Sequence, residues 1–235
     1  MRRNIFIILF LVLAFVLMST ESDFAKGIDA YQRGMIRKAI EYFENSVKNN
    51  PRFAEGYFNL GVCYVKIGEI DMGIVNYNQA IVLRPNYAEA FHNRALAYRR
   101  KGFLTHAVES YMKAVEINPR YEASYNNLGF VYHQMEEYDE AIDCFRKAIE
   151  INPRNADYYN NIGSSMYAKG MVDLAIEYYK KALERNSNHA DALYNMGIAY
   201  EFKRNRTMNI SYTQQAARLG HREAQNYLRE RRVNW

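Results

Sequence analysis

Cysteine, proline and tryptophan are scarce in this sequence of 235 residues, which contains two, four and one of them. Two cysteines with no CxxC spacing and no histidine at ligand spacing predict no metal site. Four prolines and twelve glycines are too few for a turn-rich β protein. The five histidines form no triad with serine or cysteine, and the glycines form no phosphate-binding loop. The sequence therefore predicts no catalytic site and no cofactor.

Strong charge of one sign is also absent from most of the chain. The net charge is +5. The excess of positive charge lies between Glu201 and Trp235, a segment that contains eight Lys or Arg residues and three Glu residues. Binding of nucleic acid would need a basic stripe on a defined surface, so we expect no nucleic-acid partner. The basic end is interpreted as a solvated tail, with contact to acidic lipid or to an acidic partner as the alternative.

Only one long apolar run occurs, Ile5–Met18, with Arg2 and Arg3 before it and polar residues after it. This order is typical of a secretory signal. As a helix the run reaches about 21 Å, which is short of a hydrocarbon core of roughly 30 Å. Residues 1–22 are thus predicted to be a cleaved signal peptide or an uncleaved N-terminal anchor, and a buried helix of a cytosolic protein is the third reading.

Either of the first two readings places the remaining chain across a membrane, because the two arginines stay inside. The protein would then be exported, to a periplasm, a secretory lumen or the exterior, or anchored by its N-terminus. Membrane contact would come through residues 1–20. Two triplets, Asn205-Arg-Thr and Asn209-Ile-Ser, fit the acceptor pattern for N-glycosylation.

A period of 34 residues organises the rest of the sequence, and all four prolines lie on it: Pro51, Pro85, Pro119 and Pro153. Small residues keep the same step at Gly61, Ala95, Gly129, Gly163 and Gly197. Aromatic residues do so at Phe43, Tyr77, Tyr111, Phe145 and Tyr179. Self-similarity at such a period predicts a repeat architecture, in which the many tyrosines serve packing.

Each repeat has the pattern of two amphipathic helices. The first carries the spacing i, i+3, i+4, i+7 at Tyr125, Leu128, Gly129 and Tyr132. The second carries i, i+4, i+7 at Ala141, Phe145 and Ala148. Proline separates repeats because it cannot continue one helix and fits the first turn of the next. A single pair of helices cannot bury its apolar face, so the repeats must stack.

The segment Tyr125–Pro153 resembles the tetratricopeptide-repeat (TPR) family, with its aromatic-x2-Leu-Gly-x2-Tyr, Ala-x3-Phe and Pro signature. The resemblance implies an all-α, right-handed superhelical solenoid of about six helical hairpins over residues 23–223. The repeats lie near 20–53, 54–87, 88–121, 122–155, 156–189 and 190–223. A basic capping helix and tail follow at 224–235, and Ala216–Leu228 looks more like a Sel1-type repeat.

The resemblance also implies that the first helix of each repeat lines a concave groove. The sixth position of that helix holds five asparagines in register: Asn59, Asn93, Asn127, Asn161 and Asn195. Their amides could satisfy the backbone of a bound peptide, or could tie one helix to its neighbour. The fifth position completes the predicted peptide-binding set with Phe58, His92, Asn126, Asn160 and Tyr194.

Acidic residues at the second position of four of these helices, Glu55, Glu89, Asp157 and Asp191, would repel an acidic C-terminal tail. We therefore do not expect the clamp for such tails that some TPR proteins have. Apolar groove positions, Val62, Leu96, Phe130 and Ile198, suggest an extended ligand with some hydrophobic side chains.

The function predicted from the sequence is a non-enzymatic scaffold, exported or tethered to a membrane, that binds an extended peptide segment in its groove. No residues remain for a separate catalytic domain beside the repeats. The alternative is a membrane-anchored structural component of an envelope assembly. It would bind folded partners through its convex face and its basic tail.

Overall fold

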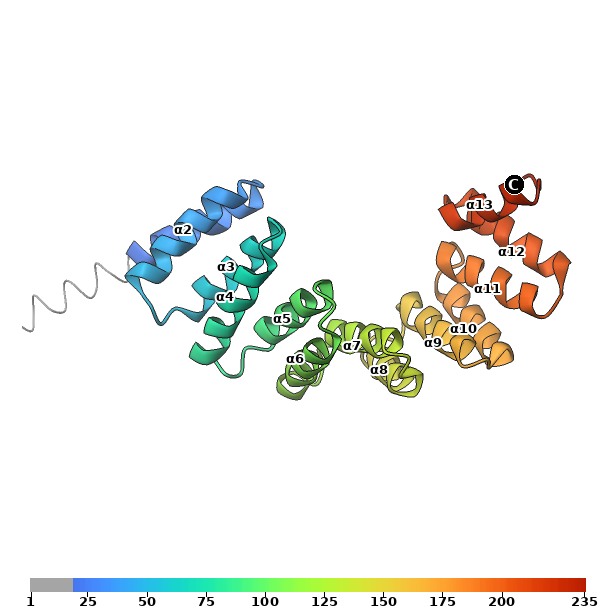
Figure 1. The fold of residues 1–235 in the computed structure, drawn as a ribbon, viewed down its shortest axis with the longest axis horizontal. Helices are drawn as coiled ribbons and strands as arrows, with labels where there is room; N and C mark the ends of the chain where they lie inside the picture. Colours follow the sequence, from blue (N-terminus) through green and yellow to red (C-terminus); the bar gives the residue numbers. More distant parts are fainter. Residues whose placement is uncertain (1–18) are drawn as a thin grey trace, which may run out of the picture. The chain divides into compact units, whose positions relative to one another are not determined.

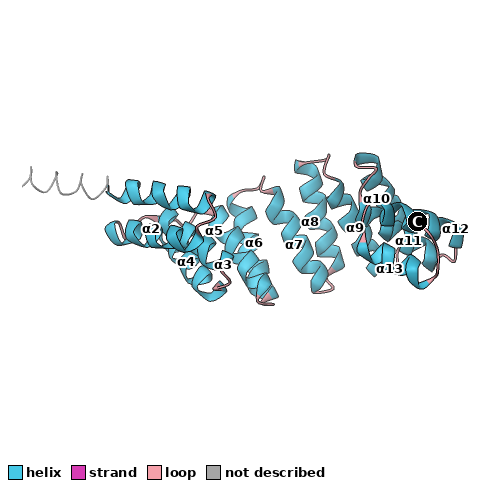
Figure 2. Cartoon of the chain, turned by 90° about the horizontal axis from the view of Figure 1, so that it is seen from above, coloured by secondary structure: helices cyan, strands magenta, loops and turns pink. Residues whose placement is uncertain are grey.

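The computed structural model describes residues 19–235, and the regular elements in this range are all α-helices (Figure 2). The apolar run predicted to be a signal peptide or an anchor lies outside the described residues. Among residues 19–235, no helix combines the length and the apolar character that crossing a bilayer requires.

The chain divides into two compact units, Met1–Pro119 and Arg120–Trp235, which are described separately. The N-terminal unit has a helix over residues 19–32, followed by α2 (Ile36–Asn49), α3 (Ala54–Lys66), α4 (Ile70–Leu83), α5 (Ala88–Arg100) and α6 (Leu104–Ile117). The C-terminal unit contains α7 (Glu122–Gln134), α8 (Tyr138–Ile151), α9 (Ala156–Ala168), α10 (Val172–Arg185), α11 (Ala190–Phe202), α12 (Arg206–Arg218) and α13 (Arg222–Glu230) (Figure 1).

Consecutive helices pack in antiparallel pairs within each unit. We call the first helix of a pair the A helix (residues 19–32, α3, α5, α7, α9 and α11) and the second the B helix (α2, α4, α6, α8, α10 and α12). Each unit stacks three pairs, and α13 packs on α12 at the end of the C-terminal unit. The predicted fold class, an all-α fold of repeated helical hairpins, is confirmed.

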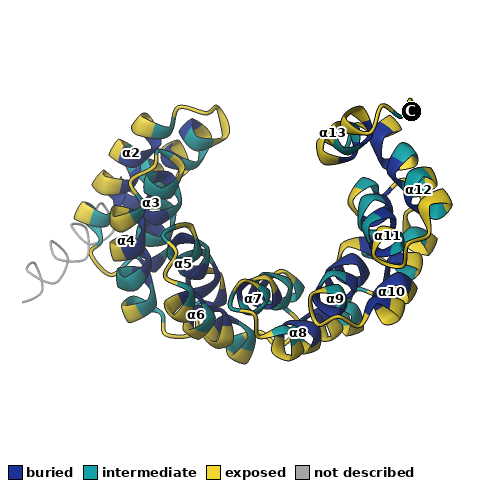
Figure 3. Ribbon diagram, turned by 45° about the vertical axis from the view of Figure 1, so that its right-hand side comes forward, coloured by how far each residue is buried: buried dark blue, intermediate teal, exposed yellow. Residues whose placement is uncertain are grey.

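A glycine on the A helix allows close packing with an aromatic ring of the B helix. A Cβ added at Gly163 would lie 2.6 Å from the ring of Tyr179, and one added at Gly129 would lie 2.7 Å from Phe145. Both rings are almost completely buried. Figure 3 shows buried residues in dark blue where the helices of each unit meet. The aromatic residues on the 34-residue period are thus core residues.

The turn between A and B helices requires a left-handed backbone at one fixed place in each pair. Glycine supplies it at four of these places, with positive φ at Gly34, Gly68, Gly102 and Gly170. In the other two pairs Glu136 (φ 63°) and Arg204 (φ 56°) adopt the same conformation. A side chain with a Cβ is strained there, because its Cβ approaches the backbone.

Both ends of the described chain depart from the repeat pattern and are nevertheless well packed. Residues 19–32 form a regular helix, in which Phe24 lies 5.5 Å from the ring of Phe43 and Gly27 occupies the small position. At the other end Asn209 is 3% exposed. Its Nδ2 donates to the Gly197 carbonyl at 3.0 Å, and its Oδ1 accepts from the Tyr227 hydroxyl at 2.9 Å. The second glycosylation triplet therefore has a buried acceptor asparagine.

Candidate functional site

The A helices of the C-terminal unit form an open pocket of about 510 Å³. Its lining comes from α7, α8, α9 and α11 and from the start of α13, namely Phe130, His133, Phe145, Asn160, Asn161, Ser164, Asp191, Tyr194, Asn195, His221 and Glu223. Four of these are predicted site residues: Asn160, Asn161, Tyr194 and Asn195. The pocket lies entirely within the C-terminal unit.

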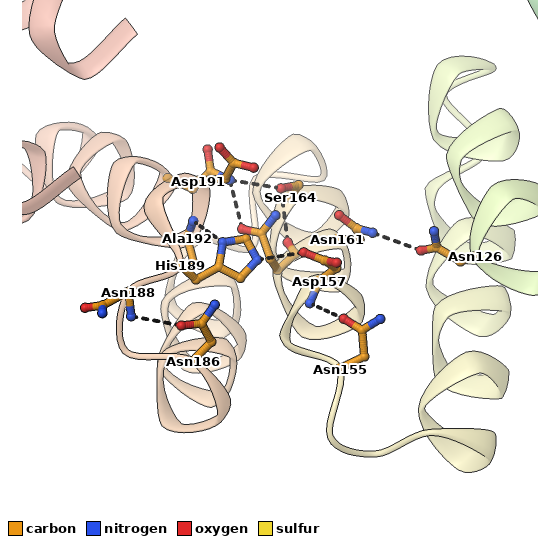
Figure 4. Close-up of polar contacts among 12 residues, drawn as sticks. Asn126, Asn155, Asp157, Asn161, Ser164, Asn186, Asn188, His189, Asp191 and Ala192 are labelled. Atoms are coloured by element: carbon orange, nitrogen blue, oxygen red, sulfur yellow. Dashed lines mark hydrogen bonds and ion pairs between the residues drawn. The ribbon is translucent and has the colours of Figure 1, made fainter. Parts of the chain in front are cut away.

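Two asparagines of the pocket tie neighbouring A helices together, as Figure 4 shows in part. The Nδ2 of Asn161 donates to the Oδ1 of Asn126 at 3.1 Å. The Nδ2 of Asn195 donates to the Oδ1 of Asn160 at 3.0 Å and to the Ser164 hydroxyl at 3.4 Å. Within the described residues, the Oδ1 atoms of Asn161 and Asn195 accept no hydrogen bond, so both retain an acceptor in the pocket.

The other three asparagines of the sixth position bond within their own helices. Asn59 donates to the Glu55 carbonyl at 2.8 Å, and Asn93 donates to the Glu89 carbonyl at 2.8 Å. Asn127 donates in the same way to the carbonyl of Ala123, at 2.9 Å. These amides therefore do not connect one repeat with the next.

Two fifth-position residues of the N-terminal unit pack against aromatic rings. The ring of Phe58 lies 5.9 Å from that of Tyr77 and 5.0 Å from that of Tyr87. His92 is 8% exposed, and its ring lies 5.4 Å from that of Tyr111. The structure thus brings only part of the predicted set together in one pocket, and contact with a peptide stays a prediction for every residue of the set.

A repeated pairing of histidine with aspartate was not anticipated from the sequence. The Nε2 of His189 lies 3.0 Å from the Asp157 carboxylate, while its Nδ1 accepts from the Ala192 amide at 3.4 Å (Figure 4). His221 repeats the arrangement, with Nε2 3.3 Å from Asp191 and Nδ1 3.2 Å from the amide of Ala224.

An Nδ1 atom that accepts from an amide favours the ring tautomer with its proton on Nε2, the nitrogen that faces the carboxylate. Each histidine therefore caps the start of its helix and orients the carboxylate on the preceding A helix. The available signal in the sequence was an aspartate about one repeat before each histidine, Asp157 for His189 and Asp191 for His221.

Negative charge dominates the pocket. Asp191 and Glu223 contribute carboxylates whose side chains are 68% and 69% exposed, and no lysine or arginine lines the pocket. Burial lowers the pKa of His133, whose Nδ1 lies 3.0 Å from the Ser165 hydroxyl, and this keeps its ring neutral near pH 7. Among the described residues, no group of three histidine, cysteine or acidic side chains could hold a metal ion.

Comparison with known families gives the class of this protein. Family models described as tetratricopeptide repeat match residues 24–72, 123–155, 156–189 and 178–210, and one described as TPR repeat matches 63–102 and 95–136. The chain belongs to the tetratricopeptide-repeat family. The matched segments end at residue 210, and the Sel1-like character of Ala216–Leu228 stays a prediction.

Solved structures agree with this assignment. The chain is 30% identical to the MamA protein, with a TM-score of 0.68, covering 73% of this chain and 94% of that one. It is 22% identical to YrrB, described as a TPR protein with an unusual peptide-binding site (TM-score 0.65, covering 80% and 97%). It is 20% identical to PilF of Pseudomonas aeruginosa (TM-score 0.74, covering 92% and 99%). Among curated proteins, no sequence matches the chain.

Proposed function

We propose that this protein is an interaction scaffold that binds an extended segment of a partner protein along the A helices of its C-terminal unit. The pocket carries the proposal, because it combines an exposed aromatic ring, Phe130, with amide oxygens that have no donor among the described residues. Acceptors of this kind suit backbone N–H groups, which every peptide offers regardless of its side chains.

The spacing of the amides also suits an extended chain. Neighbouring helices pack about 10 Å apart, and an extended peptide advances about 3.3 Å per residue. One asparagine would therefore meet about every third residue of the ligand. The peptide-binding site ascribed to YrrB is consistent with such a use of the fold, although the likeness to that protein is one of fold.

The proposed binding needs no cofactor and no catalytic group. The carboxylates of Asp191 and Glu223 disfavour an acidic C-terminal tail as the ligand, because like charges would meet in the pocket. Export or tethering through residues 1–22 remains part of the proposal and depends on the apolar run in the sequence.

Two alanine variants that remove the same hydrogen bond test the proposal. Asn161→Ala removes both the bond to Asn126 and the amide in the pocket, whereas Asn126→Ala removes only the bond. We expect Asn161→Ala to lose partner capture from cell extract, while Asn126→Ala keeps most of it. Urea unfolding measures the loss of stability, about 1 kcal/mol for either variant. Equal capture by both variants would mean that Asn161 serves packing alone.

A second candidate function, contact through the basic C-terminal surface, is favoured by a separate observation. A hollow of about 350 Å³ is lined by Glu201, Arg204, Arg206, Asn209, Ile210, Tyr227 and Arg231. One of its arginines, Arg231, is already engaged, with Nη2 3.0 Å from Glu201 and its guanidinium 3.7 Å from the ring centre of Tyr227. If this surface binds the partner, Arg204→Ala with Arg206→Ala abolishes capture and Asn161→Ala does not.

A further inference from the structure

We infer that the bound segment carries a lysine or arginine side chain that contacts the carboxylates of Asp191 and Glu223 from the pocket, with an apolar side chain held at Phe130. The inference rests on the proposed function and specifies the chemistry of the partner. It starts from the balance of charge inside the pocket.

Glu223 lacks a hydrogen-bond donor on the histidine nearest to it. Its carboxylate lies 3.5 Å from the Nδ1 of His221, but that nitrogen already accepts from the amide of Ala224. The other ring nitrogen, Nε2, lies 3.3 Å from the carboxylate of Asp191. One imidazole therefore contacts two carboxylates, and since it carries at most one positive charge, the group of three side chains keeps a net negative charge.

No other side chain that lines the pocket supplies a positive charge to the two carboxylates. The remaining lining residues are aromatic, amide or hydroxyl side chains, together with His133, which burial keeps neutral near pH 7. A ligand cation that reaches both carboxylates from the pocket is attracted by each of them. An arginine or lysine side chain provides that cation on a peptide, and several of its N–H donors can be used at once.

An aromatic wall accompanies the carboxylates. The ring of Tyr194 lies on that of His221, with centroids 4.5 Å apart and an interplanar angle of 30°. The apolar stem of a lysine or arginine can cover such a wall while its charged end reaches the carboxylates. The charged end of the lysine or arginine would thus contact the carboxylates, and its apolar stem would cover the rings of Tyr194 and His221.

The other end of the pocket is apolar. Phe130 is 38% exposed, and its ring packs edge-on against that of buried Phe145, with centroids 5.7 Å apart. Phe130 lies on α7 and Asp191 on α11, two A helices further along, which is about 20 Å at the usual helix spacing. An extended chain covers that distance in roughly six residues. The predicted motif is therefore an apolar residue and a basic residue about six positions apart.

Selection from a phage library of random dodecapeptides by the immobilised full-length chain tests the motif. The key variant is Asp191→Asn with Glu223→Gln, which removes both charges, while the amide oxygen introduced at position 191 can still accept from the Nε2 of His221. The matched control is Asp143→Asn with Glu177→Gln, which removes two exposed carboxylates from the B helices of the same unit.

We expect the unaltered chain and the control to enrich lysine or arginine paired with an apolar residue, and the key variant to lose that enrichment. In a synthetic copy of a selected peptide, replacing the basic residue by glutamine should weaken binding about tenfold at low salt, and less at high salt. Peptides enriched without basic residues would overturn the inference and leave the proposed function standing. If the unaltered chain enriches no peptide, the proposed function fails and the inference fails with it.

Discussion

At the scale of single residues, asparagines at the same repeat position form different hydrogen bonds, depending on the residue of the preceding repeat that lies beside them. Asn161 and Asn195 bridge to the preceding A helix because its fifth position holds an asparagine, Asn126 or Asn160. For Asn93 the corresponding residue is Phe58, which offers no acceptor, and the amide turns to the Glu89 carbonyl of its own helix. The environment of an asparagine in this column therefore depends on one residue of the preceding repeat.

Buried His92 gives the N-terminal unit a dependence on pH. Burial, with a smaller contribution from the positive charge of Arg99, lowers its pKa to about 4. Above pH 6.5 the ring is neutral in both the folded and the unfolded chain, so it adds no pH dependence there. Below pH 6.5 the unfolded chain binds a proton that the folded chain does not, and the free energy of unfolding falls until about pH 4.

The expected loss from this one group is about 3 kcal/mol across that range. Urea unfolding of the full-length chain between pH 7 and pH 4 measures it, with His92→Gln as the variant and exposed His106→Gln as the control. The His92→Gln chain should show a flatter pH profile than the other two. Identical profiles for all three chains would contradict a depressed pKa at His92.

At the scale of helices and turns, much of the fold could be predicted from the sequence. Periodic prolines, alanines and aromatics specify the pairs of helices, because each marks a boundary or a contact that recurs. The A helices α3, α5, α7, α9 and α11 begin at Ala54, Ala88, Glu122, Ala156 and Ala190. The regular helix over residues 19–32 was less apparent, since Asp23 and Lys26 replace the usual Tyr and Leu. Gly27 kept the small position and was the available signal.

The pocket could be predicted only in part, because its chemistry depends on which side chains hydrogen-bond to one another. The periodicity placed asparagines on one face of the A helices but could not say which amides are used between helices. The pairing of His221 with Asp191 depends on a histidine that caps α13, where the repeat spacing changes. A 34-residue period therefore did not align His221 with His189, although both precede an acid by two residues.

A turn residue gives a prediction at this scale. Glu136 holds a positive φ of 63° at the place where most other pairs have glycine. Glu136→Gly should raise the free energy of unfolding by about 1 kcal/mol, because glycine adopts this conformation without strain. The control is Gly170→Ala, with φ 79° and no atom within 4 Å of an added Cβ, which should lower it by about the same amount. Thermal unfolding of both variants measures these changes. A Glu136→Gly chain that is less stable than the unaltered chain would contradict backbone strain at Glu136.

At the scale of the whole molecule, the chain is a TPR protein, and we propose that the pocket of its C-terminal unit binds a peptide. Amide oxygens without a donor among the described residues, an apolar ring and two carboxylates lie on consecutive A helices and at the start of α13. The B helices and the basic C-terminal surface are the competing places for a partner. Binding in the pocket and binding at the B helices or the basic C-terminal surface differ in which residues the partner contacts.

Site-specific photocrosslinking in cells that make the protein tests this difference most directly. A photoreactive phenylalanine analogue would replace Ser164, which lines the pocket, or Glu177, which is exposed on the B helix α10. The account predicts that a partner is crosslinked from position 164 and not from position 177. A partner crosslinked from position 177 alone would contradict binding in the pocket.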